Sequence, residues 1–420
     1  MQKMVTNIFQ NPHHVFWALF QQFGSRGFVA VKWLIVARLL GPEQFGVFSA
    51  SLLILAISDA LSQIGVSTAL IQGDEPNKRK SNAAWTFLLL RGATVSIILL
   101  ISTPFLDFFV TEEIANIFIF FSLIPLMKNS YSIGYVLSQK NRDFRRLAFF
   151  ENGVSILDIF FSLLFIILNM GVYGVAIGAL LAVFLAALLS HFIFPYKNSI
   201  NFEFHLIKDY IKYGRWIWSH SIINLIIFQF DKVLVFYFLG TLSLGYYQMA
   251  LKISQILVYD LPFALGNYLF PSFAETYHRN SDTLSNYFIR FFIPLVASIL
   301  AIAVILTSFA NEIIIILLGA DWQIISPVFV ILVWAAFFSA ISVPFVALNR
   351  AIGKPEVITF AISTQLVIFV TLSCILIQKN MSLGVAISSF IGNFIFLAIL
   401  SINTIVLFMN FDESRKNDNN

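Results

Sequence analysis

Polar and ionisable residues interrupt the first apolar segment of the chain at helical spacing. Gln21, Ser25 and Lys32 lie at positions i, i+4 and i+11, which places them on one stripe of a helix. Gln22 and Arg26 flank this stripe. A charge at the centre of a bilayer costs at least about 2.5–3.5 kcal/mol, so charged residues inside a membrane helix are candidates for a substrate or ion path. The spacing therefore predicts a polar seam that lines such a path.

The second half of the chain carries a matching seam. An offset of 199 residues relates the first stripe to His220, Asn224 and Asp231, with Lys232 on its flank. Because repeat-related helices present the seam at the same position, we expect both to face a shared central cavity. Two neighbouring helices add further polar residues, which are Gln248, Lys252, Gln255, Tyr259 and Asp260 in one and Asp59, Ser62 and Gln63 in the other.

Two roles are predicted for these residues. The expected substrate-binding set is Arg26, Lys32, Gln21, Gln22, Asn224, Lys232, Gln248, Lys252 and Gln255. The expected coupling or gating set is Asp59, His220, Asp231 and Asp260, and an unperturbed histidine titrates near neutral pH. A structural interpretation stays open, in which Lys32 and Asp231 form an ion pair that locks the two halves together or Lys32 snorkels to the membrane interface.

The composition requires lipid as the solvent for much of the chain. Of 420 residues, 59% are hydrophobic and 11% are charged, whereas a soluble domain carries about 25% charged residues. The mean hydropathy is +0.84. The net charge of +4 then reflects Lys and Arg in cytoplasmic loops rather than nucleic-acid binding. The single cysteine, Cys374, excludes an internal disulfide and a Cys-based metal site, and no metal site is expected.

The apolar segments predict an all-α integral membrane protein of about 12 transmembrane helices. The expected helices are 14–39, 45–71, 84–106, 114–138, 150–169, 172–195, 214–239, 244–271, 286–318, 324–348, 355–378 and 382–409. Most of the 26 Lys and Arg residues then lie on the face that holds both termini, and only Arg38 and Lys379 lie in loops of the other face. The positive-inside rule therefore places both termini in the cytoplasm.

Two sequence anchors indicate a duplication. The pattern L-G-x4-G-x-aromatic occupies 40–48 and again 239–247, and the tetrapeptide G-V-A-I occupies 174–177 and again 384–387. Six helices is an even number, so the halves are predicted to be parallel six-helix repeats around a central cavity. The predicted lobes are 1–200 and 201–410, followed by a cytoplasmic tail at 411–420.

The same motifs carry a family resemblance. Residues 38–46 resemble the R-x-L-G-P-x-x-[FY]-G segment of polysaccharide-export flippases, and Asp59 with 64–72 resembles their D-x-G-x-x-x-A-L-I-Q segment, although Asp59 is separated from Gly65 here. In the second half, 213–215, Asp231-Lys232 and 239–247 are also similar. The chain thus resembles the Wzx-like oligosaccharide flippases of the polysaccharide transport group, within the multidrug/oligosaccharidyl-lipid/polysaccharide exporter superfamily.

The resemblance implies a function in surface polysaccharide assembly, such as O-antigen or capsule export. Such proteins move a polyprenyl-diphosphate-linked oligosaccharide from the cytoplasmic to the outer leaflet of the bacterial inner membrane by alternating access. The basic residues would offset the charge of the diphosphate, and the amides would hydrogen-bond sugars. Membrane lipids and a polysaccharide polymerase complex are the implied partners. No cofactor is expected, and coupling to protons, Na+ or the membrane potential is the implied drive.

Three other functions stay open. An ion-coupled drug or metabolite antiporter of the same fold is the main alternative, although a net cationic cavity would repel cationic drugs. A membrane enzyme of polysaccharide assembly is disfavoured, because the external loops are about a dozen residues or fewer and the sequence holds neither a phosphate-binding Gly loop nor an H-E-x-x-H motif. A purely structural scaffold would not need buried charges.

Overall fold

The structure is a computed structural model that describes residues 12–63, 65–74, 76–106, 111–279 and 283–418. For some helical residues in these ranges only the backbone is described, among them Gln22, His220 and 410–418. The described residues are 92% helical and form no strand, which confirms the all-α prediction.

The chain divides into two compact units, residues 1–229 and 230–420, with the boundary inside α10 (Lys208–Ser254). The other elements of the first unit are α2 (Pro12–Ser62), α3 (Val66–Gln72), α4 (Lys78–Leu106), α5 (Glu112–Ser122), α6 (Ile124–Asn129), α7 (Ile133–Lys140), α8 (Phe144–Ile167), α9 (Gly171–Ile193) and the 3-10 turn η1 (Phe204–Ile207). Within this unit α8 packs on both α2 and α9, and α4 packs on α5 and α6.

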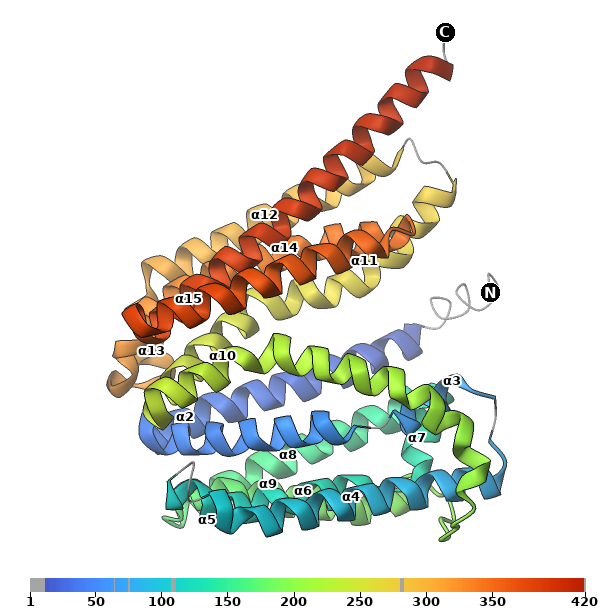
Figure 1. Cartoon of the computed structure of the whole chain (residues 1–420), viewed down its shortest axis with the longest axis vertical. Coiled ribbons are helices and arrows are strands. Elements are labelled where there is room, and N and C mark those ends of the chain that lie inside the picture. Colours follow the sequence, from blue (N-terminus) through green and yellow to red (C-terminus); the bar gives the residue numbers. More distant parts are fainter. Residues whose placement is uncertain (1–11, 64, 75, 107–110, 280–282, 419–420) are drawn as a thin grey trace. The chain divides into compact units, whose positions relative to one another are not determined.

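The second unit continues from α10 into a π-helix, η2 (Gln255–Tyr259), without a loop. It then contains α11 (Asp260–Arg279), α12 (Leu284–Ser308), α13 (Ala310–Leu318), the 3-10 turn η4 (Ala320–Ile325), α14 (Ser326–Ala351) and α15 (Pro355–Asp418). Helix α14 lies at the centre of this unit, where it packs on α11, α12 and α15 (Figure 1).

The predicted number of membrane spans is confirmed by the breaks in the helices. Eight helices in the described part of the chain are long and apolar enough to cross a membrane, and the bent pair 112–129 and 133–140 makes a ninth. Three of the eight, α2, α10 and α15, each contain a non-helical residue that divides them into two spans. Twelve spans result, in agreement with the count from hydropathy.

Glycine breaks the first helix pair of each repeat in the same way. Gly41 has φ 72° and ψ 176°, and Gly240 has φ 77° and ψ −176°. This backbone region is essentially restricted to glycine, because a Cβ would clash with the chain itself. The two residues are the first glycines of the L-G-x4-G-x-aromatic motif, so the motif encodes a helix–corner–helix unit. Figure 1 shows α2 turning back on itself at this corner.

The second sequence anchor is a close helix contact. A Cβ on Gly174 would lie 2.8 Å from the carbonyl carbon of Phe165, and a Cβ on Gly384 would lie 2.4 Å from the carbonyl oxygen of Leu376. Each glycine thus lets the last helix of its repeat approach the preceding one, as small residues do between membrane helices. The G-V-A-I match therefore has a packing reason in both units.

Met381 occupies a strained corner that glycine fills in the first repeat. It has φ 52° and ψ −138°, and the residue 210 positions earlier is Gly171 at φ 54°. Replacing Met381 by Gly is expected to stabilise the fold by about 1 kcal/mol, because relief of strain outweighs the entropy that glycine adds to the unfolded chain. Thermal unfolding in detergent measures this. Met381→Ala, which keeps the Cβ, is the control, and equal stability of the two variants would contradict the prediction.

Some predicted helices are interrupted. The expected helix 45–71 ends at Ser62, and a Cβ on Gly65 in the interruption would lie 2.3 Å from Ile217. The expected helix 114–138 is divided into α5, α6 and α7, with Pro125 at the start of α6, where its missing N–H is tolerated. The expected helix 286–318 is divided between α12 and α13. Hydropathy found these spans but not their breaks.

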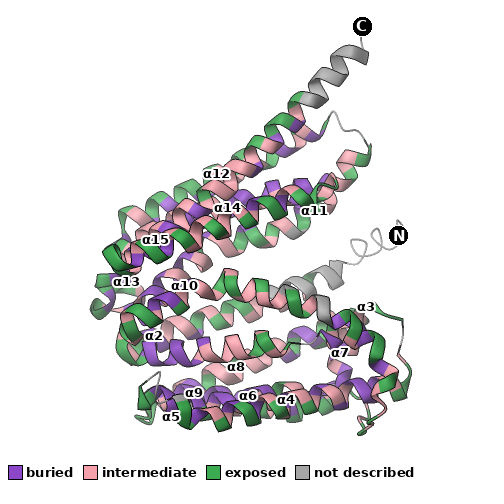
Figure 2. Cartoon of the chain, viewed as in Figure 1, coloured by how far each residue is buried: buried purple, intermediate pink, exposed green. Residues whose placement is uncertain are grey.

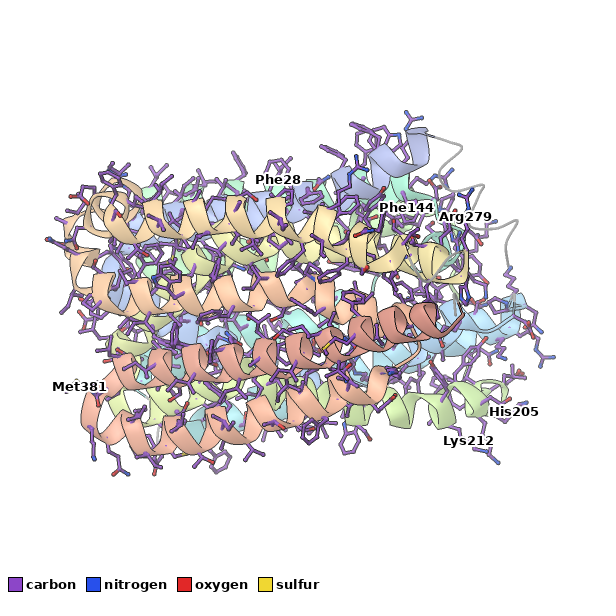
Figure 3. All side chains as sticks on the ribbon, turned by 90° about the horizontal axis from the view of Figure 1, so that it is seen from above. Phe28, Phe144, His205, Lys212, Arg279 and Met381 are labelled. Atoms are coloured by element: carbon purple, nitrogen blue, oxygen red, sulfur yellow. The ribbon has the colours of Figure 1, made fainter. Side chains whose placement is uncertain are left out.

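The outer helix faces match a lipid environment. Exposed residues run along the full length of α12 (Figure 2), and among them are Ile293, Val304 and Ile305 at 61%, 47% and 54% exposure. In Figure 3 most of the side-chain atoms along the middle of the helices are carbon, and nitrogen and oxygen atoms are sparse there. Apolar side chains exposed at this scale require a membrane, so the chain is a multi-pass membrane protein.

Candidate functional site

The polar seam of the first membrane helix faces α8. Gln21 Nε2 donates to Glu151 Oε1 at 2.9 Å, and Lys32 Nζ donates to Asp158 Oδ1 at 2.6 Å. Glu151 and Asp158 are seven residues apart, so they share one face of α8. In this structure the seam is therefore a helix–helix contact with two carboxylates.

Lys32 lies in a nearly closed environment within the first unit. Its side chain is 8% exposed and that of Asp158 is 26% exposed. The ammonium also lies 5.9 Å from the centre of the Phe48 ring, and Ser162 Oγ donates to Asp158 Oδ1 at 3.4 Å. A buried ammonium with one carboxylate partner is electrically balanced, and release of either partner would leave an uncompensated charge.

The part of the seam nearer the N-terminus is more open to solvent than the part around Lys32. Tyr135 donates its hydroxyl hydrogen to the same Glu151 oxygen that accepts from Gln21, at 2.9 Å. The Ser25 hydroxyl donates back to the Gln21 carbonyl at 2.7 Å and so stays on its own helix. Arg26 is exposed, whereas the side chain of Gln22 lies outside the described residues.

Asp59 is tied to α4. Arg91 Nη2 contacts Asp59 Oδ1 at 3.0 Å, and Arg91 Nε donates to the Ser62 carbonyl at 2.7 Å. The Asp59 side chain is 61% exposed and that of Arg91 is 14% exposed. The arginine therefore fixes the end of α2 and neutralises the carboxylate predicted as a coupling group.

The first segment of α10 contacts the end of α2 within the first unit. Trp218 Nε1 donates to the Leu61 carbonyl at 2.7 Å, and Ser221 Oγ donates to Gln63 Oε1 at 3.0 Å. Asn224, three residues further along, is half-buried. The side chain of His220 lies outside the described residues, so its predicted role in coupling remains a prediction.

The second unit holds Asp231 as a buried carboxylate. Asp231 is 7% exposed, and the hydroxyl of the fully buried Tyr247 donates to its Oδ2 at 3.0 Å. Lys232 Nζ lies 3.7 Å from its Oδ1. The carboxylate is thus balanced by groups of its own unit, just as Lys32 is balanced by Asp158.

Lys32 and Asp231 are the two buried charged side chains of the described residues, each at 7% exposure. They are separated by the repeat offset of 199, and the aromatic residues that they contact, Phe48 and Tyr247, are separated by the same offset. The two repeats therefore keep one buried charge at the same position with opposite sign.

The hydrogen bond from Tyr247 can be tested by deletion of one oxygen. Tyr247→Phe is expected to destabilise the protein by about 1–3 kcal/mol, because buried Asp231 loses a donor while its charge remains. Thermal or urea unfolding in detergent measures this. Tyr246→Phe, which keeps the ring contact with Trp322, is the matched control. An equal loss in both variants would contradict the role assigned to the hydroxyl.

The remaining predicted residues surround the π-helix η2. Gln248 precedes it, and its buried Oε1 has no hydrogen-bond partner among the described residues. Lys252 and Asp260 lie just before and just after it, and Gln255 is its first residue. All four side chains are half-buried. π-Helices are rare and occur frequently at functional sites, which agrees with the placement of these residues.

Sequence reasoning did not assign the residues that complete the seam to the predicted site. Glu151 was not singled out, and the pairing of Lys32 with Asp158 was not predicted. The signal was present, because two carboxylates seven residues apart inside an apolar helix need cationic or donor partners on a neighbouring helix. In the part of the chain that the structure describes, no cluster of three metal-ligating residues occurs.

Two curated proteins of polysaccharide biosynthesis are similar to this chain in sequence. The lipopolysaccharide biosynthesis protein WzxC of Escherichia coli strain K12 is 21% identical over 347 residues, which are 79% of this chain and 68% of WzxC. The succinoglycan biosynthesis transport protein ExoT of Rhizobium meliloti strain 1021 is 23% identical over 279 residues, which are 64% of this chain. The match spans only 56% of the length of ExoT.

Two solved structures share the fold. An inward-facing multidrug resistance MATE family transporter of the MOP superfamily aligns with a TM-score of 0.67 and 16% identity, over 94% of this chain and 96% of that one. The lipid II flippase MurJ in an inward closed conformation aligns with a TM-score of 0.67 and 16% identity, over 94% of this chain and 89% of that one. The fold is therefore that of MOP-superfamily transporters.

The family assignment comes from the sequence. A family model described as "Polysaccharide biosynthesis protein" matches residues 35–327, which include the corner at Gly41, the Lys32-facing helix α8 and the whole of α10. The matched residues are 70% of the 420-residue chain. The chain, a multi-pass membrane protein, belongs to the polysaccharide biosynthesis protein family.

Proposed function

We propose that the protein flips a polyprenyl-diphosphate-linked oligosaccharide from the cytoplasmic to the outer leaflet of a bacterial inner membrane. Its repeat unit would then enter surface polysaccharide assembly, next to a polymerase complex. Family membership supports the link to polysaccharide synthesis. The fold shared with a lipid II flippase supports a lipid-linked substrate.

The observation that carries the proposal is the pair of repeat-equivalent buried charges. Lys32 is the cation best placed inside the membrane to meet a phosphate, yet Asp158 occupies it here. Binding of a diphosphate at Lys32 therefore requires exchange of one anion for another. Protonation of Asp158 would neutralise that carboxylate and free the ammonium, which would link substrate binding to proton entry.

The other predicted residues take supporting roles in this proposal. Arg26, Lys232 and Lys252 supply further positive charge for the diphosphate, and the amides of Gln21, Gln22, Asn224, Gln248 and Gln255 hydrogen-bond the sugars. The unpartnered Oε1 of Gln248 is the acceptor best suited to a sugar hydroxyl. Asp59, His220, Asp231 and Asp260 remain candidates for coupling to protons, Na+ or the membrane potential, and Asp158 joins them.

The deciding experiment is the leaflet distribution of the lipid-linked oligosaccharide. Cells that lack the gene are expected to accumulate completed repeat units on the cytoplasmic leaflet and to lose surface glycan. Wild-type protein supplied from a plasmid should restore both. Unchanged lipid-linked pools together with intact surface glycan would refute the proposal.

The equal likeness to a multidrug transporter gives small-molecule export as the second candidate. This function predicts that deletion sensitises cells to dyes or cationic antibiotics while surface glycan stays intact. Because the carboxylates of Glu151 and Asp158 offset the positive charge of the seam, the deletion phenotype and not charge separates the two candidates.

A further inference from the structure

An apolar groove runs along the outer side of α8 and α9 in the first unit. Its volume is about 290 Å³, and its walls include Phe149, Gly153, Ile156 and Leu157 from α8 with Leu189 and Ile193 from α9. Gly153 leaves it open, because an added Cβ there would meet nothing within 4 Å. Every one of these side chains is hydrocarbon, so the groove fits an alkyl chain and offers no hydrogen bond to a sugar.

One end of the groove carries a cation held in place by aromatic rings. The Arg145 guanidinium lies 5.8 Å from the centre of the Trp17 ring, and the Trp17 ring lies 5.1 Å from that of Phe149, which lines the groove. Tryptophan and arginine are the residues that anchor proteins at the headgroup level of a membrane. The groove therefore begins at a headgroup-level rim and continues into the hydrocarbon region.

Arg145 differs from the arginine beside it. Arg146 Nε lies 3.1 Å from Asp143 Oδ2, so its charge is paired. Arg145 has no carboxylate within 4 Å among the residues that the structure describes. Its charge is available to an anion at the rim, such as the phosphate of a lipid.

The groove lies on the opposite side of α8 from the polar seam. At 100° per residue, Gly153, Ile156 and Leu157 point away from the stripe of Glu151 and Asp158. A lipid chain in the groove would thus be separated from the seam by the helix itself. This placement favours a resident membrane lipid over the transported one.

We propose that this groove binds one anionic phospholipid, with an acyl chain between α8 and α9 and its phosphate at Arg145. The start of α8 at Phe144 lies at the same end of the first unit as His205 and Lys212 (Figure 3), which is the predicted cytoplasmic end. The bound lipid then belongs to the inner leaflet. It packs against the side of α8 that is opposite the Lys32–Asp158 contact.

The test is lipid binding to the purified full-length protein by native mass spectrometry in detergent. Delipidated protein is titrated with phosphatidylglycerol and, separately, with phosphatidylcholine of the same chains. One phosphatidylglycerol should bind about tenfold more tightly than phosphatidylcholine, and Gly153→Leu and Arg145→Gln should each weaken it about tenfold. Gly153→Ala controls for the loss of glycine, and Arg146→Gln controls for the loss of an arginine. Both controls should stay within about twofold of the unchanged protein.

Three results would overturn the proposal. They are equal binding of the two lipids, no effect of Gly153→Leu, and an equal loss in Arg146→Gln and Arg145→Gln. A polyprenyl phosphate that displaces phosphatidylglycerol with the same variant dependence would assign the groove to the substrate chain instead. Since no outcome depends on transport, failure here leaves the proposed flippase function untouched. The unfolding temperature of each variant without added lipid shows whether it has folded.

Discussion

Replacing Lys32 by Met is expected to lower the free energy of unfolding by about 3–5 kcal/mol, because the half-buried Asp158 then keeps its charge without a partner. Asp158→Leu should destabilise by a similar amount for the converse reason. Unfolding in detergent, followed by circular dichroism against temperature or denaturant, measures both. No other side-chain substitution proposed for this protein carries a larger expected cost.

The double variant Lys32→Met with Asp158→Leu should recover most of that loss, since two apolar side chains of similar volume replace the balanced pair. The exposed pair of Arg146 and Asp143 is the matched control, and Arg146→Gln, which leaves Asp143 to cap α8, should cost no more than about 1 kcal/mol. A double variant as unstable as the single ones would contradict the pairing seen in the structure.

The same double variant separates stability from transport. If the charges serve substrate binding or coupling, it should fold and yet fail to restore surface glycan in cells that lack the gene. Full restoration would make the contact purely structural. Exchange of the two residues, Lys32→Asp with Asp158→Lys, then shows whether a positive charge must lie on the first helix.

Gly41→Ala and Gly240→Ala are each expected to destabilise by about 1–3 kcal/mol, and together by about 2–6 kcal/mol. Apart from the adjoining backbone, nothing lies within 4 Å of an added Cβ at either position, so the cost comes from the backbone angles alone. Because no contact is shared, the two losses should add. Thermal unfolding of the two single variants and the double variant measures this.

Gly27→Ala is the matched control for the corner glycines. It also has open space at the Cβ position and lies inside a regular part of α2. Alanine there should stabilise by about 0.5–1 kcal/mol through helix propensity. A corner variant that behaves like Gly27→Ala would show that the left-handed conformation is not needed.

Hydropathy and loop charge were sufficient to predict the fold. In lipid every backbone N–H and C=O group needs a hydrogen-bond partner within the protein. A run of about 20 apolar residues therefore usually forms a helix, which pairs these groups within the segment. The repeat could be predicted from the spacing of its motifs alone. The glycines of the motif occur in both halves because Gly41 and Gly240 form the same corner between two helices. The predicted lobe boundary at 200, the cytoplasmic termini and the shared cavity remain predictions.

The partners of the polar residues could not be predicted in the same way. Helical spacing shows that Gln21 and Lys32 share a face, but it does not show which neighbour lies opposite. The repeat suggested Asp231 as the partner of Lys32, since the two positions are equivalent. Within the first unit the structure gives Lys32 a different partner, Asp158, because α8 packs directly on α2.

The π-helix at 255–259 indicates one way in which the two halves of the sequence could differ in length. A turn that closes from i to i+5 holds one residue more than an α-helical turn, so it accommodates a single inserted codon without breaking the helix. The offset between the halves grows from 199 at the glycine corners to 210 at the G-V-A-I contact. Such a turn would absorb one step of that growth, because an added residue held in the wide turn spares the later side chains the rotation of about 100° that it would cause in a regular α-helix.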